Sequence, residues 1–178
     1  SLNLVNDYET INGKPFDWND PMMAANPFKD RDPRFYLDIL YNGASYINDY
    51  IISTYEGGDD VGSIYSTKTS FYLKKFMSSN VNWWTSNATV TAHHPFIFFR
   101  YAEILLNYAE AMNEAYGPDS DPEGYGKTAR QAITQIRTRA GLTGNRDLLE
   151  TVPSGDKNAM RNAIRKERRI ELAFEEHR

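Results

Sequence analysis

From Phe96 to the C-terminus, apolar residues recur at the spacing of an α-helix, and this pattern constrains the fold more than any other feature. In the first stretch they alternate at intervals of four and three residues, which places them along one face of a helix. The residues of this predicted face are Phe98, Ala102, Leu105, Ala109, Met112 and Tyr116. Gly117 and Pro118 follow and predict where the helix ends.

Two further stretches have the same period. One runs from Thr128 to Leu142 and contains Gly141, which suits a left-handed helix cap. The other begins near Asp156 and is predicted to continue to the end of the chain. The apolar residues expected to pack are Ala129, Ala132, Ile133, Ile136 and Ala140 in the second helix and Met160, Ile164, Ile170 and Phe174 in the third.

The first two predicted helices, joined by the insert "GPDSDPEGYG", have the form of a tetratricopeptide-like pair. Alanines at their contact positions permit close approach of the helices. A single pair cannot bury its outer face alone. We therefore expect neighbouring elements that this chain does not contain.

The last predicted helix, "RNAIRKERRIELAFEEHR", is rich in arginine and so invites comparison with nucleic-acid-binding helices. Its glutamates interleave with the basic residues, and Arg168 and Glu171 are spaced to pair on the exposed face. The whole chain has 20 basic and 24 acidic residues, a net charge of −4, which disfavours phosphate backbones. We expect a scaffold helix and no nucleic-acid partner.

Residues 1–95 have a different character, with many Asn, Asp, Gly, Pro and Ser residues between short apolar runs. The runs "RFYLDILYNG", "YINDYIIS" and "FYLKKFM" predict a few short strands in a loop-rich region. Turns are expected at Asn12-Gly13, Asn42-Gly43 and Gly57-Gly58. The predicted fold is therefore mainly α, with a helix pair, a further helix and a loop-rich N-terminal half.

Several classes of site are disfavoured by composition. The chain has no cysteine, which excludes disulfides and thiolate chemistry, and His93 and His94 are adjacent, so they cannot form a spaced ligand pair on one helix face. No run approaches the roughly 20 apolar residues of a membrane-spanning helix. The chain does not begin with Met and ends within a predicted helix, which suggests a portion of a larger protein. We expect no metal and no cofactor.

Four ordered stretches resemble the SusD/RagB family, surface-exposed glycan-binding lipoproteins of Bacteroidetes. The first two are "NPFKDRDPRFYLDILYNG" and "KTSFYLKKF". The third is "PFIFFRYAEILLNYAEAMNE" with "AITQIRTRAGL", and the fourth is "IRKERRIELAFEEHR". Together they cover about residues 8 to 178 and are similar to the C-terminal region of the family.

The resemblance implies that residues 1–178 form a C-terminal region with two portions. Residues 1–95 would be the loop-rich ligand side and residues 96–178 the helical scaffold, while the true N-terminal part and the extreme C-terminus would be absent. The implied function is non-catalytic binding of glycans at the outer-membrane cell surface, for uptake through a SusC-like TonB-dependent transporter. Attachment to the membrane would use a lipid anchor outside this chain.

Aromatic side chains beside polar groups are the candidate glycan contacts, because sugars present both C–H faces and hydroxyls. Trp83 and Trp84 lie among asparagines in a segment without apolar periodicity. Trp18 is followed by Asn19 and Asp20, which can donate and accept hydrogen bonds. Weaker candidates are Tyr46, Tyr50 and Tyr55. Trp83 and Trp84 could instead anchor and cover their loop, Trp18 could stabilise a turn, and the tyrosines could pack on a strand.

The charged residues of the motifs are expected to belong to the scaffold. Arg31 and Arg34 can pair with carboxylates of the helices, and Glu103 and Glu110 with arginines of a neighbouring helix such as Arg137, Arg139, Arg168 or Arg169. Acidic loops, at Asp59-Asp60 and from Asp119 to Glu123, have oxygen ligands suited to calcium but lack the EF-hand pattern. We expect solvated loops there.

Two alternative functions remain open at this point. A glycoside hydrolase would need two carboxylates about 5–9 Å apart beside an aromatic platform, and the sequence marks no such pair outside the helices. A tetratricopeptide-like scaffold that binds only a protein partner is the other alternative. We expect no catalytic residues.

Overall fold

The computed structural model describes residues 2–58, 66–78, 93 and 97–176, and within these ranges it is mainly helical, as predicted. The chain divides into two compact units. One comprises Ser1–Leu2 and Tyr36–Ile97 and is called the loop unit here. The other, the helical unit, comprises Asn3–Phe35 and Phe98–Arg178. Residues 3–35 thus belong with the helices, although the sequence had suggested a division near residue 95.

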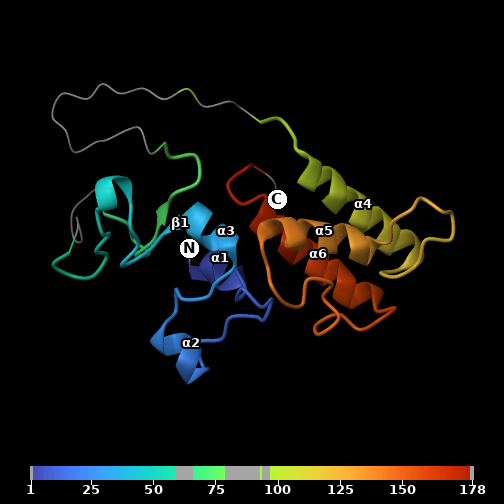
Figure 1. Cartoon of the computed structure of the whole chain (residues 1–178), viewed down its shortest axis with the longest axis horizontal. Helices are drawn as coiled ribbons and strands as arrows, with labels where there is room; N and C mark the ends of the chain where they lie inside the picture. Colours follow the sequence, from blue (N-terminus) through green and yellow to red (C-terminus); the bar gives the residue numbers. More distant parts are fainter. Residues whose placement is uncertain (1, 59–65, 79–92, 94–96, 177–178) are drawn as a thin grey trace. The chain divides into compact units, whose positions relative to one another are not determined.

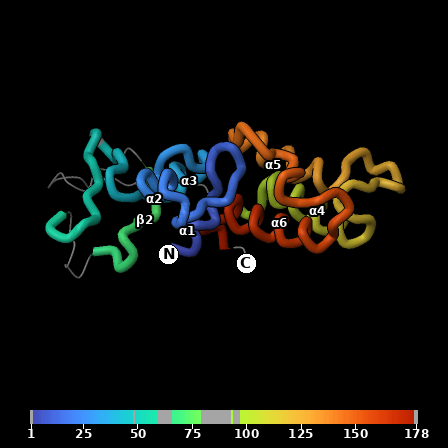
Figure 2. The backbone as a smooth tube through the Cα atoms, turned by 90° about the horizontal axis from the view of Figure 1, so that it is seen from below, coloured from blue at the N-terminus to red at the C-terminus, as the bar shows by residue number. Residues whose placement is uncertain are grey.

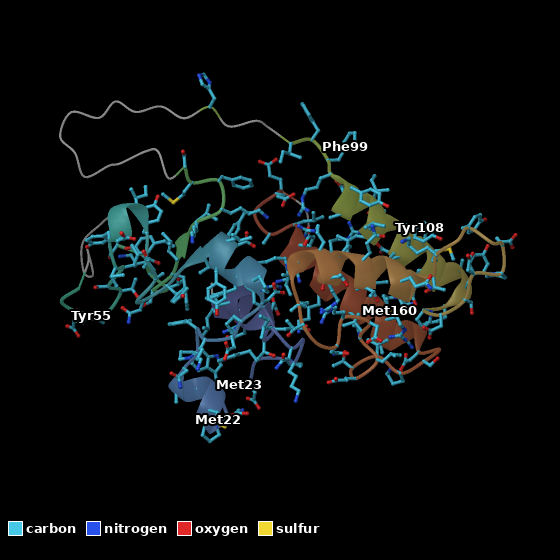
Figure 3. All side chains as sticks on the ribbon, viewed as in Figure 1. Met22, Met23, Tyr55, Phe99, Tyr108 and Met160 are labelled. Atoms are coloured by element: carbon cyan, nitrogen blue, oxygen red, sulfur yellow. The ribbon has the colours of Figure 1, made fainter. Side chains whose placement is uncertain are left out.

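Three helices form the core of the helical unit: α4 (Tyr101–Tyr116), α5 (Ala129–Ala140) and α6 (Lys157–Glu171). Helix α4 packs against both others, and the chain reverses direction between α4 and α5 (Figures 1 and 2). Met160, labelled in Figure 3, is completely buried among them. The buried core residues are Leu105, Leu106, Ala109, Met112, Ala129, Ala132, Ile133, Ile136, Leu148, Val152, Met160, Ile164 and Leu172.

The predicted buried face of α4 is confirmed at Ala102, Leu105, Ala109 and Met112. It is wrong at Phe98, which precedes the helix and is 80% exposed. The helix begins only at Tyr101 because Arg100 has an extended backbone, and its guanidinium donates to Glu175 Oε2 at 2.8 Å. The apolar period therefore extends further toward the N-terminus than the helix does, and the residue before the helix is engaged in a tertiary ion pair.

Helix α6 begins after Asp156, whose side chain accepts a hydrogen bond from the amide of Ala159, in agreement with the predicted start. The predicted end is wrong, because the helix stops at Glu171 and residues 172–176 form turns. Phe174 has a φ of 64° and is 42% exposed, so it does not belong to the packed face. Met160, Ile164 and Ile170 are buried as predicted.

Helix α5 has clear signals at both ends. Thr128 and Gln131 form a reciprocal capping box, in which each side chain accepts a hydrogen bond from the other residue's amide, at 3.2 and 2.9 Å. At the other end, Gly141 has a φ of 90° and a ψ of 14°, the left-handed cap that the sequence predicted.

Removal of the capping hydroxyl by Thr128→Ala should lower the free energy of unfolding by about 1 kcal/mol, because the amide of Gln131 loses its acceptor. Urea unfolding followed by circular dichroism measures this change. Thr138→Ala is the matched control on an exposed position of the same helix, and it should leave stability unchanged or slightly raised. Equal effects of the two substitutions would contradict the capping assignment.

Three short helices that the sequence did not predict lie near the N-terminus: α1 (Leu2–Asp7), α2 (Pro21–Ala25) and α3 (Pro33–Asp38), the last of which crosses the boundary between the two units. A bridge joins Thr10 to Arg31 between them. Phe35 is buried and packs edge-on against Tyr8, with ring centroids 5.7 Å apart. Helices this short are stable only through tertiary packing, so they leave no periodic signal in the sequence.

The loop unit contains one small antiparallel sheet in its described part, made by β1 (Ile39–Leu40) and β2 (Tyr72–Leu73). In its register Ile39 pairs with Leu73 and Leu40 pairs with Tyr72. The first and third predicted strand segments thus each supply two strand residues. The second forms a 3₁₀ turn, η1 (Ile47–Asp49), flanked by an isolated Ser45–Ile51 bridge. Gly43 and Gly57 have φ values of 87° and 85°, consistent with the predicted turns.

Candidate functional site

Trp18 is held so that one part of its ring is supported and another part is exposed. Its indole N–H donates to Asn6 Oδ1 at 2.9 Å, and its ring meets Phe16 edge-on with centroids 5.0 Å apart. The side chain remains 41% exposed. A tryptophan fixed on two sides and open on another has the form of a stacking platform.

The polar residues after Phe16 are ordered by their own local hydrogen bonds. Asp17 Oδ1 accepts from the main-chain amide of Asn19 at 2.8 Å and from its side-chain amide at 2.9 Å. Asp20 Oδ1 caps α2 by accepting from the amides of Met22 and Met23, at 2.8 and 3.2 Å. Asp17 and Asn19 are both exposed and flank Trp18 in the sequence.

The support of Trp18 continues into the protein through Phe16. The guanidinium carbon of Arg31 lies 4.1 Å from the centroid of the Phe16 ring, a cation–π contact. Arg31 is 1% exposed and donates to the carbonyl groups of Pro27 and Tyr8 at 2.7 and 2.8 Å. Trp18, Phe16, Asn6, Asp17 and Asn19 are called the Trp18 surface here.

Phe16 and Asn6 were not among the residues expected from sequence. A signal for Phe16 was present, because residues two apart in an extended segment point to the same side. No sequence signal marks Asn6, which lies on α1 and meets Trp18 only through the fold. Met22, four residues after Trp18 in the sequence, is labelled in Figure 3, and its side chain is 82% exposed.

The loop unit holds the tyrosine candidates. The amide of Tyr46 donates to the carbonyl of Tyr50 at 2.8 Å, so the two residues flank the η1 turn. The hydroxyl of Tyr46 lies 3.5 Å from the sulfur of Met77, and burial raises the pKa of this hydroxyl. Tyr50 is 38% exposed and Tyr55, labelled in Figure 3, is 60% exposed. Tyr50 and Tyr55 are therefore partly exposed in the loop unit, and Tyr46 and Tyr50 are joined through their main chains.

Trp83 and Trp84 lie outside the described residues, as do the asparagines near them and the acidic pair Asp59-Asp60. Their role as ligand contacts stays a prediction from sequence. The acidic residues Asp119 and Asp121 of the α4–α5 loop accept hydrogen bonds from other residues of the helical unit. The hydrogen bond from Arg130, 2.6 Å long, lowers the pKa of the Asp119 carboxyl to about 2. Asp121 accepts from the amides of Tyr125 and Gly126.

The motif arginine Arg34 lies in a buried ionic network, as the scaffold prediction required. It donates to Asp32 Oδ2 at 2.7 Å, to Glu167 Oε1 at 2.6 Å and to Glu171 Oε2 at 2.8 Å. The side chains of all four residues are at most 7% exposed. Arg34 therefore ties the N-terminal segment of the helical unit to α6.

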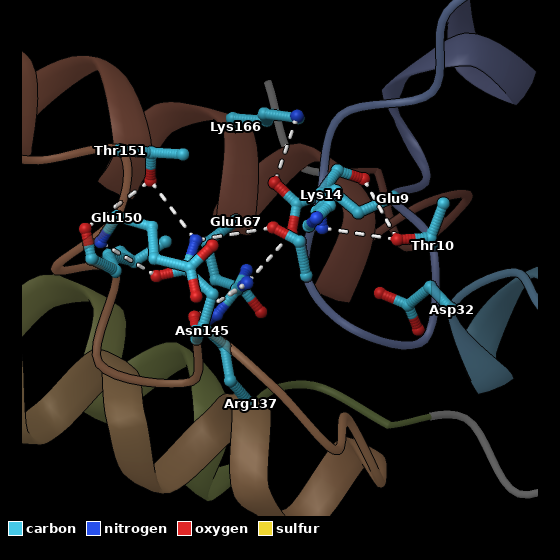
Figure 4. Close-up of polar contacts among 12 residues, drawn as sticks. Glu9, Thr10, Lys14, Asp32, Arg137, Asn145, Glu150, Thr151, Lys166 and Glu167 are labelled. Atoms are coloured by element: carbon cyan, nitrogen blue, oxygen red, sulfur yellow. Dashed lines mark hydrogen bonds and ion pairs between the residues drawn. The ribbon is translucent and has the colours of Figure 1, made fainter. Parts of the chain in front are cut away.

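The same network extends through α5. Arg137 donates to Glu167 Oε2 at 3.0 Å and to Glu9 Oε2 at 2.7 Å, and Lys166 donates to Glu9 Oε1 at 3.0 Å (Figure 4). Burial raises the pKa of Glu167, but the charges of Arg34 and Arg137 outweigh burial and hold it below the usual glutamate value. Glutamates of α6 are thus structural ion partners.

Two glutamates, Glu171 and Glu110, differ in how they meet the arginines expected as their partners. Glu171 does not pair with Arg168 on the exposed face, because it is 3% exposed and binds Arg34, Arg100 and Arg139. Arg168 instead donates to Glu110 at 3.1 Å, which confirms the predicted partnership of Glu110 with a neighbouring helix. Glu110 is therefore a scaffold residue.

Neither a metal centre nor a membrane helix is found in the part of the chain that the structure describes. Within its described ranges, no three or more His, Cys, Asp or Glu residues are arranged so that they could hold a metal ion. None of the described helices has the length and apolar character needed to cross a bilayer. The candidate site therefore consists of partly apolar, partly hydrogen-bonding surfaces.

Known proteins similar to this chain agree with the fold. A SusD-like protein of Bacteroides fragilis has a solved structure that matches with a TM-score of 0.70 and 29% identity, covering 98% of this chain and 33% of that protein. A SusD-like carbohydrate-binding protein of the same species matches with a TM-score of 0.69 and 27% identity, with the same coverage. SusD-like protein P2 of Formosa agariphila is 38% identical over 81 residues, which is 45% of this chain and 15% of that protein.

The chain thus spans about a third of the length of the solved relatives. The sequence profile of the SusD family, SusD_RagB, matches residues 1–178, which is the whole chain. The chain belongs to the SusD/RagB family.

Proposed function

We propose that this chain forms part of a non-catalytic glycan-binding protein, and that the Trp18 surface contacts the glycan. The observation that carries the proposal is the fixed, 41% exposed ring of Trp18 beside Asp17 and Asn19. A C–H face of a sugar would stack on the indole, while hydroxyls would bond to the carboxylate and amide groups. The carbohydrate-binding description of one solved relative supports this ligand class.

The tyrosines of the loop unit are proposed as further contacts for the same ligand class. Tyr46, Tyr50 and Tyr55 combine apolar faces with hydroxyls that can donate and accept. Trp83 and Trp84 are proposed on composition alone. Asp20 is the weakest of the proposed residues, because one of its oxygens already caps α2.

The wider role is proposed from the family. A SusD/RagB member at the outer-membrane cell surface would deliver glycan to a SusC-like TonB-dependent transporter, and a lipid anchor on the longer protein would hold it there. Co-purification of the longer protein with a SusC-like transporter, without added sugar, tests the partnership. Its absence under conditions where both proteins are folded would argue against it.

Trp18→Ala should weaken glycan binding at least about tenfold, equivalent to roughly 1.4 kcal/mol, because the stacking face is lost. Titration calorimetry against a panel of oligosaccharides measures the dissociation constant. Trp18→Phe should retain part of the affinity, because a smaller ring still stacks but cannot donate to Asn6.

Tyr125→Ala is the matched control, since Tyr125 is 62% exposed on the α4–α5 insert, away from the proposed contacts in sequence. It should leave the affinity unchanged. If Trp18→Ala and Tyr125→Ala reduced the affinity equally, the result would count against the Trp18 surface as the glycan contact. Release of reducing ends on incubation with the glycan would instead favour a hydrolase.

A further inference from the structure

The helical unit has a cleft of about 290 Å³ whose lining shares no residue with the Trp18 surface, although Pro15 of the lining directly precedes Phe16. Its lining comes from the segment around Glu9, from Arg137 on α5, from the α5–α6 connection and from α6. Pockets that hold small ligands begin near this volume, at roughly 300 Å³. All of the lining belongs to one unit, so the cleft is a feature of the helical unit itself.

Part of the cleft is apolar. Leu148 and Val152 of the connection are 4% and 2% exposed, and Ala159 and Ala163 line it from α6. The two alanines are four residues apart, so they lie one turn above the other on the same helix face. Larger side chains at these positions would occupy the space that the alanines leave.

The polar part of the lining contains buried charges. Arg137 and Glu167 have side chains 2% exposed, and the Glu9 side chain is 6% exposed. The Nε–H of Arg137 is buried and has no acceptor among the described residues. A buried donor without a partner costs free energy, so it requires an explanation in the molecule.

The accessible polar groups are Lys166 and Asn162. Lys166 is 33% exposed and uses its ammonium group on Glu9 Oε1 (Figure 4), which leaves further N–H donors for a ligand. Asn162 is exposed, and its side chain has no hydrogen bond to any residue in the described part of the chain. Both a donor and an acceptor of the Asn162 amide are therefore available at the cleft.

The charges of the lining cancel, because Glu9 and Glu167 balance Arg137 and Lys166. A charged ligand would have to compete with ion pairs already made, and such competition is unfavourable at a buried pair. A neutral molecule can accept from Lys166 and Asn162, donate to the free lone pairs of Glu9, and place C–H groups on the alanines. These are the requirements of a polyhydroxylated ligand.

We infer that this cleft binds a neutral sugar residue, either a free monosaccharide or the terminal residue of a glycan chain. This site is additional to the proposed Trp18 contact, and it binds a single sugar unit. It depends on the proposed function only for the choice of sugars as probes. The two sites are tested separately, because substitutions in one leave the residues of the other intact.

The test is a nuclear magnetic resonance titration of the whole chain with neutral monosaccharides, namely glucose, galactose, mannose, xylose and N-acetylglucosamine. Saturable shifts of the Ala159, Asn162 and Ala163 amides are expected for at least one of them, or for an oligosaccharide that contains it. Shifts with the free sugar identify a monosaccharide site. Shifts with the oligosaccharide alone identify a chain-end site.

Two substitutions sharpen the result. Ala163→Leu should abolish the shifts by filling the cleft, and Asn162→Ala should weaken binding about fivefold through one lost hydrogen bond, by the usual net value of such a bond. Arg165→Ala is the matched control on an exposed position of α6 outside the lining, and it should bind like the parent chain. Circular dichroism of each variant verifies folding.

The outcomes separate this site from the Trp18 surface. Trp18→Ala should leave the shifts at Ala159 and Ala163 unchanged even where it abolishes glycan binding elsewhere. The inference is overturned if no neutral sugar moves these amides in the folded parent chain. It is also overturned if Ala163→Leu binds as the parent does, or if a sugar acid binds more tightly than its neutral counterpart.

Discussion

Arg34→Met should remove most of the stability of the helical unit. Arg34 is the shared donor of Asp32, Glu167 and Glu171, and the side chains of those carboxylates are at most 2% exposed. Breaking a buried ion pair by removing one partner costs roughly 3–5 kcal/mol, because the remaining charge stays in a region of low polarity. A loss of that size approaches the roughly 5–15 kcal/mol that stabilises a typical domain. The expected result is a chain that is largely unfolded or melts at a much lower temperature.

Thermal unfolding by circular dichroism and urea unfolding by tryptophan fluorescence measure this effect. Methionine keeps most of the side-chain volume, so the comparison isolates the guanidinium group. Arg161→Met is the matched control, since Arg161 pairs at 2.6 Å with Glu114 on a more exposed part of the surface. Its effect should be small, because solvent screens an exposed pair. Equal losses of stability in the two variants would show that the buried network is not what holds the unit together.

Glu167→Gln should be strongly destabilising at neutral pH, and its effect should diminish in acid. The folded chain holds the pKa of Glu167 below its usual value through Arg34 and Arg137. A depressed pKa contributes stability that is fully present above the unfolded pKa, about 4.3 for glutamate, and is lost as pH falls through the folded value. The parent chain should therefore lose its advantage over Glu167→Gln only below about pH 4.

Urea unfolding of both proteins at a series of pH values gives the difference in free energy of unfolding directly. The difference should be constant from neutral pH down to the unfolded pKa and then shrink. A difference that grows in acid, or that stays the same throughout, would mean that Glu167 is not held ionised by the two arginines. The comparison uses the difference between the two proteins and not either curve alone.

The three long helices were predictable because each buries one periodic face. Ala102 and Leu105 on α4, Ile133 and Ile136 on α5, and Ile164 on α6 are all buried as their spacing indicated. The ends of α5 were also readable, because Thr128 and Gly141 carry local capping chemistry. Such signals depend on residues near one another in the chain, so a sequence can display them.

The predictions for Phe98 and Glu171 were wrong because their positions depend on residues far away in the sequence. Phe98 was expected inside α4, but the helix begins after Arg100, which has an extended backbone and pairs with Glu175. Glu171 was expected on the surface, but arginines from other segments surround it. The periodic pattern does not contain this information, because it records which face is apolar and not which charges will meet across the fold.

The candidate site shows the same division. Trp18 was marked by its own residue type and by its polar neighbours, whereas its support by Asn6 and by the Phe16–Arg31 stack was not visible in sequence. The cleft between α5, α6 and their connection left no motif at all, since its lining is gathered from separated segments. Residue type can mark a candidate contact, but concavity and burial come only from packing.

The sequence by itself determined the helical class, the buried faces of the long helices and the family, because these depend on local periodicity, caps and ordered motifs. The tertiary structure alone decided that residues 3–35 join the helical unit, that Arg34 and Arg137 bind buried glutamates of α6, and that Trp18 has a fixed, partly exposed ring. The physical reason is that ion pairs and clefts join residues far apart in the chain, and a buried charge finds its partner only when the chain has folded.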